Sequence, residues 1–82
     1  MIRIEVFGPG CARCAATKDA IRKAMETAGL EASLIHIDDP REMAKQRVFF
    51  TPAVRINGET RSIGRVPKVE EITEWLRAEA VA

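Results

Sequence analysis

Residues 6–14, with the sequence VFGPGCARC, constrain the fold of this chain more than any other stretch. They end an alternating apolar run, pass through a Gly-Pro-Gly turn and place two cysteines three positions apart where a helix should begin. The first backbone N–H groups of a helix have no partner within it and the macrodipole is positive there, so a thiol at this position is biased toward the thiolate. The stretch therefore predicts a strand-turn-helix unit that carries a reactive site.

The composition indicates a single small domain over residues 1–82. Apolar residues make up 46% of the 82 and charged residues 30%, with a formal net charge of +1. This charge gives no reason to expect nucleic acid or an anionic membrane as a partner, and no apolar run reaches the ~20 residues that span a bilayer. The chain starts directly on a strand-like run without the pattern of a secretory signal, so we expect a cytoplasmic protein.

Apolar periodicity predicts the elements of the first half of the chain. Residues 2–7 alternate as in a strand, and residues from about 11 to about 28 follow a helical period. Residues 30–38 resemble a second strand, which should run parallel to the first because a helix joins the two. Asp39-Pro40 is typical of a helix start and predicts a short helix through about residue 46, in which Met43 is buried.

The second half of the chain contains a hairpin signal followed by a helix. Asn57-Gly58 lies between two strand-like runs, residues 53–56 and 59–63, and predicts two antiparallel neighbours. The apolar residues between positions 69 and 80 then recur at helical spacing. The whole order is β-α-β-α-β-β-α, which predicts an α/β fold with a four-stranded mixed sheet flanked by helices.

Three motifs of this chain occur together in one known superfamily. They are residues 8–14 at the first strand-to-helix junction, residues 51–54 (TPAV) at the start of the hairpin, and Asn57-Gly58 followed by residues 63–66 (IGRV). With them the chain resembles the thioredoxin-like superfamily, and most closely its small archaeal and bacterial members, the redox-active disulfide proteins or mini-thioredoxins. The resemblance covers essentially the whole chain and implies a thioredoxin-like fold and a thiol-disulfide oxidoreductase.

The two cysteines would divide the chemistry of such an enzyme. Cys11 is the expected nucleophile, with a thiolate stabilised by the helix N-terminus and by the neighbouring charge of Arg13. Cys14, one turn further on, is the expected resolving thiol that attacks the mixed disulfide between Cys11 and a substrate. The plainer interpretation is that both are small buried hydrophobic residues, but cysteines in a core are not usually spaced in this way beside a glycine-rich turn.

Thr51 and Pro52 are the expected substrate-binding half of the site. The resemblance implies that Pro52 follows a cis peptide bond, lies against the cysteine pair and leaves the backbone of Thr51 free to pair with a substrate strand. A proline at the first position of a strand, where its missing N–H is tolerated, is the alternative explanation.

Glu5 lies six residues before Cys11, where the resemblance implies a buried acid that helps to move the proton of the resolving thiol. A carboxylate in an apolar site has a raised pKa and can accept a proton near neutrality. The alternation of residues 2–7, with Arg3 beside it, instead favours a partly solvated charge at Glu5.

The chain also departs from thioredoxin itself. Gly10 stands where thioredoxin has a tryptophan, and Ala12-Arg13 replaces the Gly-Pro between its cysteines. Arg13, Glu5 and Gly10 are therefore candidate tuning residues, and neither the reduction potential nor the partners of thioredoxin can be transferred. The single histidine, His36, is distant in sequence from the cysteines and is expected to be a surface residue.

Two alternatives to an oxidoreductase remain open. Copper chaperones also carry Cys-x-x-Cys between a first strand and a first helix, and two thiolates suffice for Cu(I). Pro9 stands where those proteins have a methionine, however, and Thr51-Pro52 has no role in their fold. The other alternative is a redox-sensing domain without turnover.

For the oxidoreductase we expect no cofactor or metal, a disulfide-containing protein substrate and an upstream reductase as partners, and a monomer.

Overall fold

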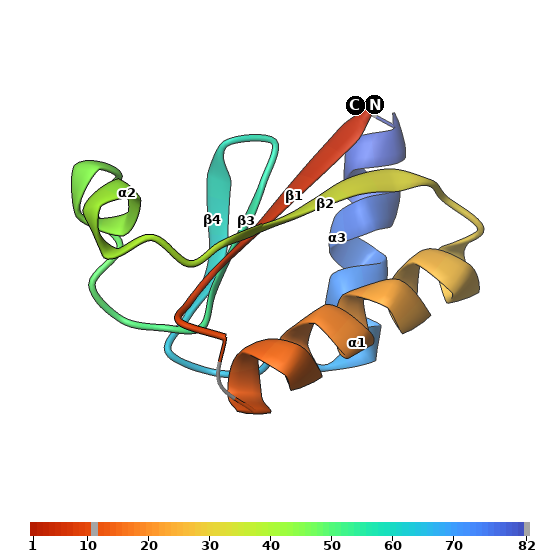
Figure 1. Cartoon of the computed structure of the whole chain (residues 1–82). Coiled ribbons are helices and arrows are strands. Elements are labelled where there is room, and N and C mark those ends of the chain that lie inside the picture. Colours follow the sequence, from red (N-terminus) through yellow and green to blue (C-terminus); the bar gives the residue numbers. More distant parts are fainter. Residues whose placement is uncertain (11, 82) are drawn as a thin grey trace.

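The computed structural model of the chain describes residues 1–10 and 12–81. Its elements follow the predicted order, as Figure 1 shows. They are β1 (Ile2–Phe7), α1 (Ala12–Ala28), β2 (Ala32–Ile37), α2 (Pro40–Lys45), β3 (Ala53–Ile56), β4 (Glu59–Ile63) and α3 (Val69–Val81). The α/β fold predicted from the sequence is confirmed, although β2 is shorter than residues 30–38.

The four strands form one mixed sheet in the order β2-β1-β3-β4. β1 pairs in parallel with β2, as the helical crossover requires, and antiparallel with β3. β3 and β4 form the antiparallel hairpin that Asn57-Gly58 predicts. A register shift between Val54 and Arg55 places Ser62 opposite Val54 but Thr60 opposite Arg55, so Arg61 is an extra residue in β4.

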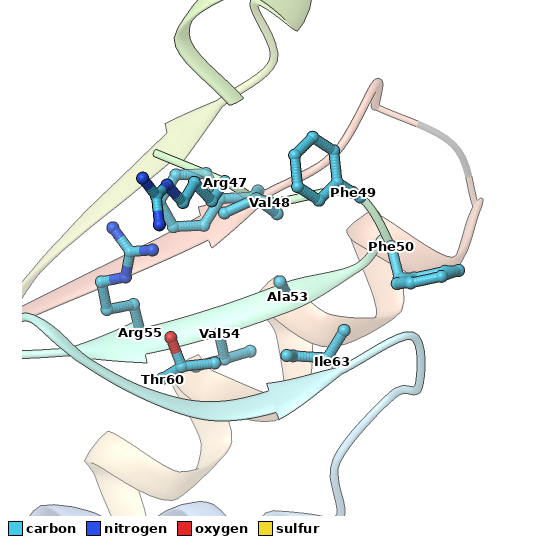
Figure 2. A pocket seen from close by; sticks show the side chains of 10 residues that line it. Arg47, Val48, Phe49, Phe50, Ala53, Val54, Arg55, Thr60 and Ile63 are labelled. Carbon is cyan, nitrogen blue, oxygen red and sulfur yellow. The ribbon is translucent and has the colours of Figure 1, made fainter. Parts of the chain in front are cut away.

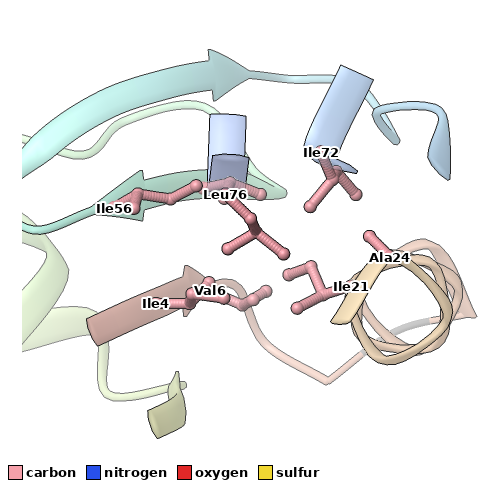
Figure 3. Packing of buried hydrophobic residues seen from close by; sticks show 8 residues of the cluster. Ile4, Val6, Ile21, Ala24, Ile56, Ile72 and Leu76 are labelled. Carbon is pink, nitrogen blue, oxygen red and sulfur yellow. The ribbon is translucent and has the colours of Figure 1, made fainter. Parts of the chain in front are cut away.

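One face of the sheet is covered by α1 and α3. Strand alternation directs Ile4 and Val6 of β1 to this face, where the register pairs them with residues of β3. Figure 3 shows how these side chains meet those of the two helices. The buried residues of this cluster are Ile4, Val6, Ile21, Ala24, Val54, Ile56, Ile72 and Leu76. Truncation of a buried Ile or Leu typically costs about 2–5 kcal/mol, so this cluster is the main source of stability.

The opposite face of the sheet is covered less completely. Phe7 and Ala53 point to this face and pack with Met43 of α2, which is buried as predicted. α2 begins after Asp39, whose side chain accepts a hydrogen bond from the Arg41 N–H at 2.9 Å. It has six residues, so it shields only part of the sheet. No helix in residues 1–10 and 12–81 is long and apolar enough to cross a membrane.

Candidate functional site

The Gly-Pro-Gly turn connects the end of β1 to the start of α1 at Ala12. Gly10 has a φ of +85°, in the left-handed region that glycine adopts without strain and other residues rarely do. This conformation gives a physical reason for glycine where thioredoxin has a tryptophan. Cys11, the predicted nucleophile, lies outside the described residues.

Cys14 lies in the first turns of α1 and is fully buried. Its sulfur occupies the space beside Gly8, because a Cβ built on Gly8 would overlap the Cys14 Sγ. The same position is 3.6 Å from the Thr51 Cβ. The structure thus brings together Gly8, Cys14 and Thr51, which come from the turn, the helix and the segment before β3. Glycine is required at position 8 because a side chain there would displace the Cys14 sulfur.

The Thr51-Pro52 peptide bond is cis, as the resemblance implies, and Pro52 is fully buried. The Pro52 carbonyl accepts a hydrogen bond from the Gly64 N–H at 2.8 Å. The Gly64 carbonyl in turn accepts one from Arg13 Nη2 at 2.7 Å. Arg13 of α1 is therefore connected through the backbone of Gly64 to the segment that carries Thr51 and Pro52.

The loop after Gly64 is held by an ion pair with α3. Arg65 donates to both carboxylate oxygens of Glu71, at 3.0 and 2.7 Å. The Lys68 N–H also donates to Glu71, at 3.3 Å, within the first turn of α3. The hydrogen bond from Arg65, aided by the one from the Lys68 backbone, lowers the pKa of Glu71, and the same pair raises the pKa of Arg65. Both groups face solvent, so the pair positions the loop more than it stabilises the domain.

Glu5, the candidate proton acceptor, is only 7% exposed. The prediction of a partly solvated charge is therefore wrong. The reason is that β1 is an interior strand, with β2 and β3 on either side. The Glu5 carboxylate forms an ion pair with Arg3 at 3.5 Å. Strand alternation directs it away from the face on which Ile4 and Val6 contact the helices.

Comparison with known proteins agrees with this geometry. A family model described as a thioredoxin domain matches residues 2–77. The chain belongs to the thioredoxin domain family. It is 37% identical over 78 residues to a thioredoxin of Methanocaldococcus jannaschii, covering 95% of this chain and 90% of that one. It is also 29% identical over 76 residues to a thioredoxin of Methanothermobacter thermautotrophicus, covering 93% of this chain and 99% of the relative.

His36 is a residue of this thioredoxin-family site that the sequence analysis missed. It is half-buried on the edge strand β2, and the prediction of a surface histidine did not include its contact with the turn. Its Nε2 lies 2.9 Å from the Gly8 carbonyl oxygen, and its Nδ1 lies 3.4 Å from Lys18 Nζ. A carbonyl can only accept, so Nε2 carries the proton and Nδ1 accepts from the Lys18 ammonium. The ring also lies against Gly10, where a Cβ would be 3.8 Å from its Cε1.

The contact between His36 and Gly8 leads to a first prediction. We expect His36→Leu to lower the free energy of unfolding by about 1 kcal/mol, because the Gly8 carbonyl loses its hydrogen-bond donor. His36→Gln should recover much of this loss, since its amide N–H reaches about as far as Nε2. Urea denaturation of both variants measures the difference. Equal stability of the Leu and Gln variants would contradict a role for the hydrogen bond.

The described residues offer no metal-binding cluster. In residues 1–10 and 12–81, no three His, Cys, Asp or Glu side chains converge in a way that could hold a metal ion. A two-thiolate Cu(I) site would need Cys11 and is therefore left to experiment.

Proposed function

We propose that this thioredoxin-family protein is a thiol-disulfide oxidoreductase, with Cys11 as the nucleophile and Cys14 as the resolving thiol. The observation that carries the proposal is the position of Cys14. Its sulfur is buried at the start of α1, packed against Gly8 and next to Thr51, in a chain that belongs to the thioredoxin domain family. The substrates are disulfides of proteins or small molecules, and the reaction takes place in the cytoplasm.

The reaction proceeds in two exchange steps. The Cys11 thiolate attacks one sulfur of the substrate disulfide, a mixed disulfide forms, and the other substrate sulfur leaves as a thiolate. Cys14 then loses its proton and attacks the Cys11 sulfur. The Cys11–Cys14 disulfide forms and the second substrate sulfur leaves. The substrate gains two electrons and two protons, and an upstream reductase returns both to the protein.

The other residues of the site would support these steps. Thr51 and Pro52 would dock the substrate chain beside the cysteines, since Thr51 already lies at the Gly8–Cys14 contact. Arg13 and Gly10 would tune the reactivity of Cys11 through charge and turn geometry. Glu5 is the candidate acceptor of the proton that Cys14 loses, and because its carboxylate points away from the face that α1 covers, the proton would reach it indirectly.

Equilibration in glutathione redox buffers, followed by thiol alkylation and mass measurement, tests this proposal. We expect one two-electron transition between a dithiol and an internal disulfide, and reduction of insulin by the protein when a dithiol donor is supplied. A protein that never forms the internal disulfide, or that binds Cu(I) stoichiometrically and reduces nothing, would refute the proposal. A normal transition without insulin reduction would favour the redox sensor.

A further inference from the structure

A pocket of about 260 Å³ lies on the sheet face opposite α1 and α3. It is bounded by the segment after α2 on one side and by β3 and β4 on the other, as Figure 2 shows. It is left open because α2 is too short to cover this part of the sheet, and because the extra residue in β4 turns both Thr60 and Ile63 toward it. Its lining residues are Phe7, Arg47, Val48, Phe49, Phe50, Ala53, Val54, Arg55, Thr60 and Ile63.

One end of the pocket is apolar and unusually exposed. Phe49 is 73% exposed, Phe50 70% and Ile63 57%, and in Figure 2 these three side chains are spread over the side of the pocket away from the guanidinium groups of Arg47 and Arg55. A cluster of exposed large apolar side chains on a small soluble domain is typical of an interaction site. Aromatic residues and arginine are also the types enriched at the energetic centres of protein interfaces.

The other end of the pocket is cationic. The guanidinium groups of Arg47 and Arg55 lie there in Figure 2, and no acidic residue lines the pocket. Arg55 is held by Gln46, whose side chain and carbonyl both accept from it, and its guanidinium lies 4.8 Å from the centre of the Phe7 ring. Among residues 1–10 and 12–81, neither arginine forms an ion pair, whereas Arg3, Arg22, Arg61 and Arg65 all do. Glu5 lies opposite Arg55 in the register of β1 and β3 and compensates part of its charge, so the positive end of the pocket depends mainly on Arg47.

The apolar end adjoins the redox site. Phe49 also lines a second hollow whose walls include Pro9 of the turn and Thr51. Phe50 lies next to Gly64: its Cβ is 3.8 Å from the position that a Cβ on Gly64 would occupy. Gly64 is the residue that is hydrogen-bonded to both Pro52 and Arg13. A chain docked at Thr51 thus has the apolar end of the pocket beside it.

We propose that this pocket binds an extended segment of a partner protein that carries an aromatic or branched aliphatic side chain next to a carboxylate. The apolar side chain lies against Phe49, Phe50 and Ile63, and the carboxylate faces Arg47 and Arg55. That this partner is also the disulfide substrate rests on the function proposed above, whereas the binding itself does not.

Cysteine-free peptides test the binding. The probe is the blocked hexapeptide acetyl-Gly-Ser-Phe-Asp-Ser-Gly-amide, with two matched controls in which Asp is replaced by Asn or Phe by Ala. Binding is followed by NMR through the backbone amides of the ¹⁵N-labelled protein. We expect shifts at Ala53, Thr60 and Ile63, and affinity about threefold lower for the Asn peptide, the size of an exposed charge pair. The Ala peptide should bind more weakly still.

Variants of the protein assign the charge effect. Arg47→Gln should remove the difference between the Asp and Asn peptides, and Arg55→Gln should act in the same direction. Arg41 is an exposed residue of α2 outside the pocket, so Arg41→Gln should leave the difference between the Asp and Asn peptides unchanged. Arg47→Gln is the decisive variant, because Arg55 also packs on Phe7. Equal affinity for the Asp and Asn peptides, shifts confined to another face, or self-association through the same amides would overturn the proposal.

Two separate measurements, disulfide reduction and peptide binding, distinguish failure of the pocket proposal from failure of the proposed redox function. Reduction of 2-hydroxyethyl disulfide, which has no aromatic group or carboxylate for the pocket, is measured on the wild-type protein and reports on the cysteines independently of the pocket. Peptide binding without any disulfide exchange would refute the redox function alone. Exchange without selective peptide binding would refute the pocket alone.

Discussion

Cys14→Ser is expected to accumulate a mixed disulfide with its substrate, because the second exchange step has lost its attacking sulfur. Intramolecular attack by a positioned thiol replaces a much slower reaction with thiols from solution, so turnover should fall by on the order of a hundredfold or more. Incubation with an aromatic disulfide, followed by intact-protein mass measurement, should show one covalent adduct that a dithiol removes.

Cys11→Ser is the matched control for this experiment. It removes the nucleophile, so it should form no adduct and should also lose turnover. The two variants therefore share the loss of activity but differ in the adduct. Equal absence of the adduct in both would contradict the division of roles between Cys11 and Cys14.

Gly8→Ala is expected to destabilise the protein and to slow disulfide exchange. The new methyl group would overlap the Cys14 Sγ, so the turn, the helix or the Thr51 segment must move. Overpacking of this kind typically costs about 1–3 kcal/mol. The free energy of unfolding from urea titration measures the cost under reducing conditions.

The Cys14→Ala background isolates the cause of this effect. Without the sulfur the added methyl group has space, so Gly8→Ala should cost much less there than in the wild type. We expect a coupling energy of about 1 kcal/mol or more from the four proteins, since the two side chains touch. Additive costs would show that backbone conformation, and not the sulfur, requires glycine at position 8.

Much of the fold could be predicted because its signals are local. The alternation of β1, the helical period of α1, the Asp39-Pro40 start of α2 and the Asn57-Gly58 hairpin each depend on residues near one another in sequence. The parallel pairing of β1 and β2 then follows from the crossover. The predicted ends of β2 were less accurate, because apolar Leu30 extends the strand-like pattern before the residues that pair with β1, Ala32–Ile37, and the prediction also included Asp38.

The sequence motifs of the site could be predicted, but the contacts between its residues could not. His36 lies beside the turn because the register pairs it with Val6, and nothing in the sequence near His36 encodes that register. Glu5 is buried because strands from distant parts of the chain flank β1. The pocket depends on what α2 fails to cover, which becomes visible only when the length of α2 is compared with the sheet beneath it. Each of these features depends on tertiary packing, which periodicity does not report.

Gly64 couples the two halves of the site, the segment of Thr51 and Pro52 and the helix of Cys14, through its two backbone hydrogen bonds. Its N–H donates to the Pro52 carbonyl and its carbonyl accepts from Arg13, so a single residue links the segment before β3 to the first turn of α1. In the proposed function, a substrate chain that displaced Thr51 and Pro52 would act through Gly64 on the helix that carries Cys14. We then expect the factor by which substrate binding shifts the dithiol–disulfide equilibrium to equal the factor by which oxidation of the cysteines changes substrate affinity.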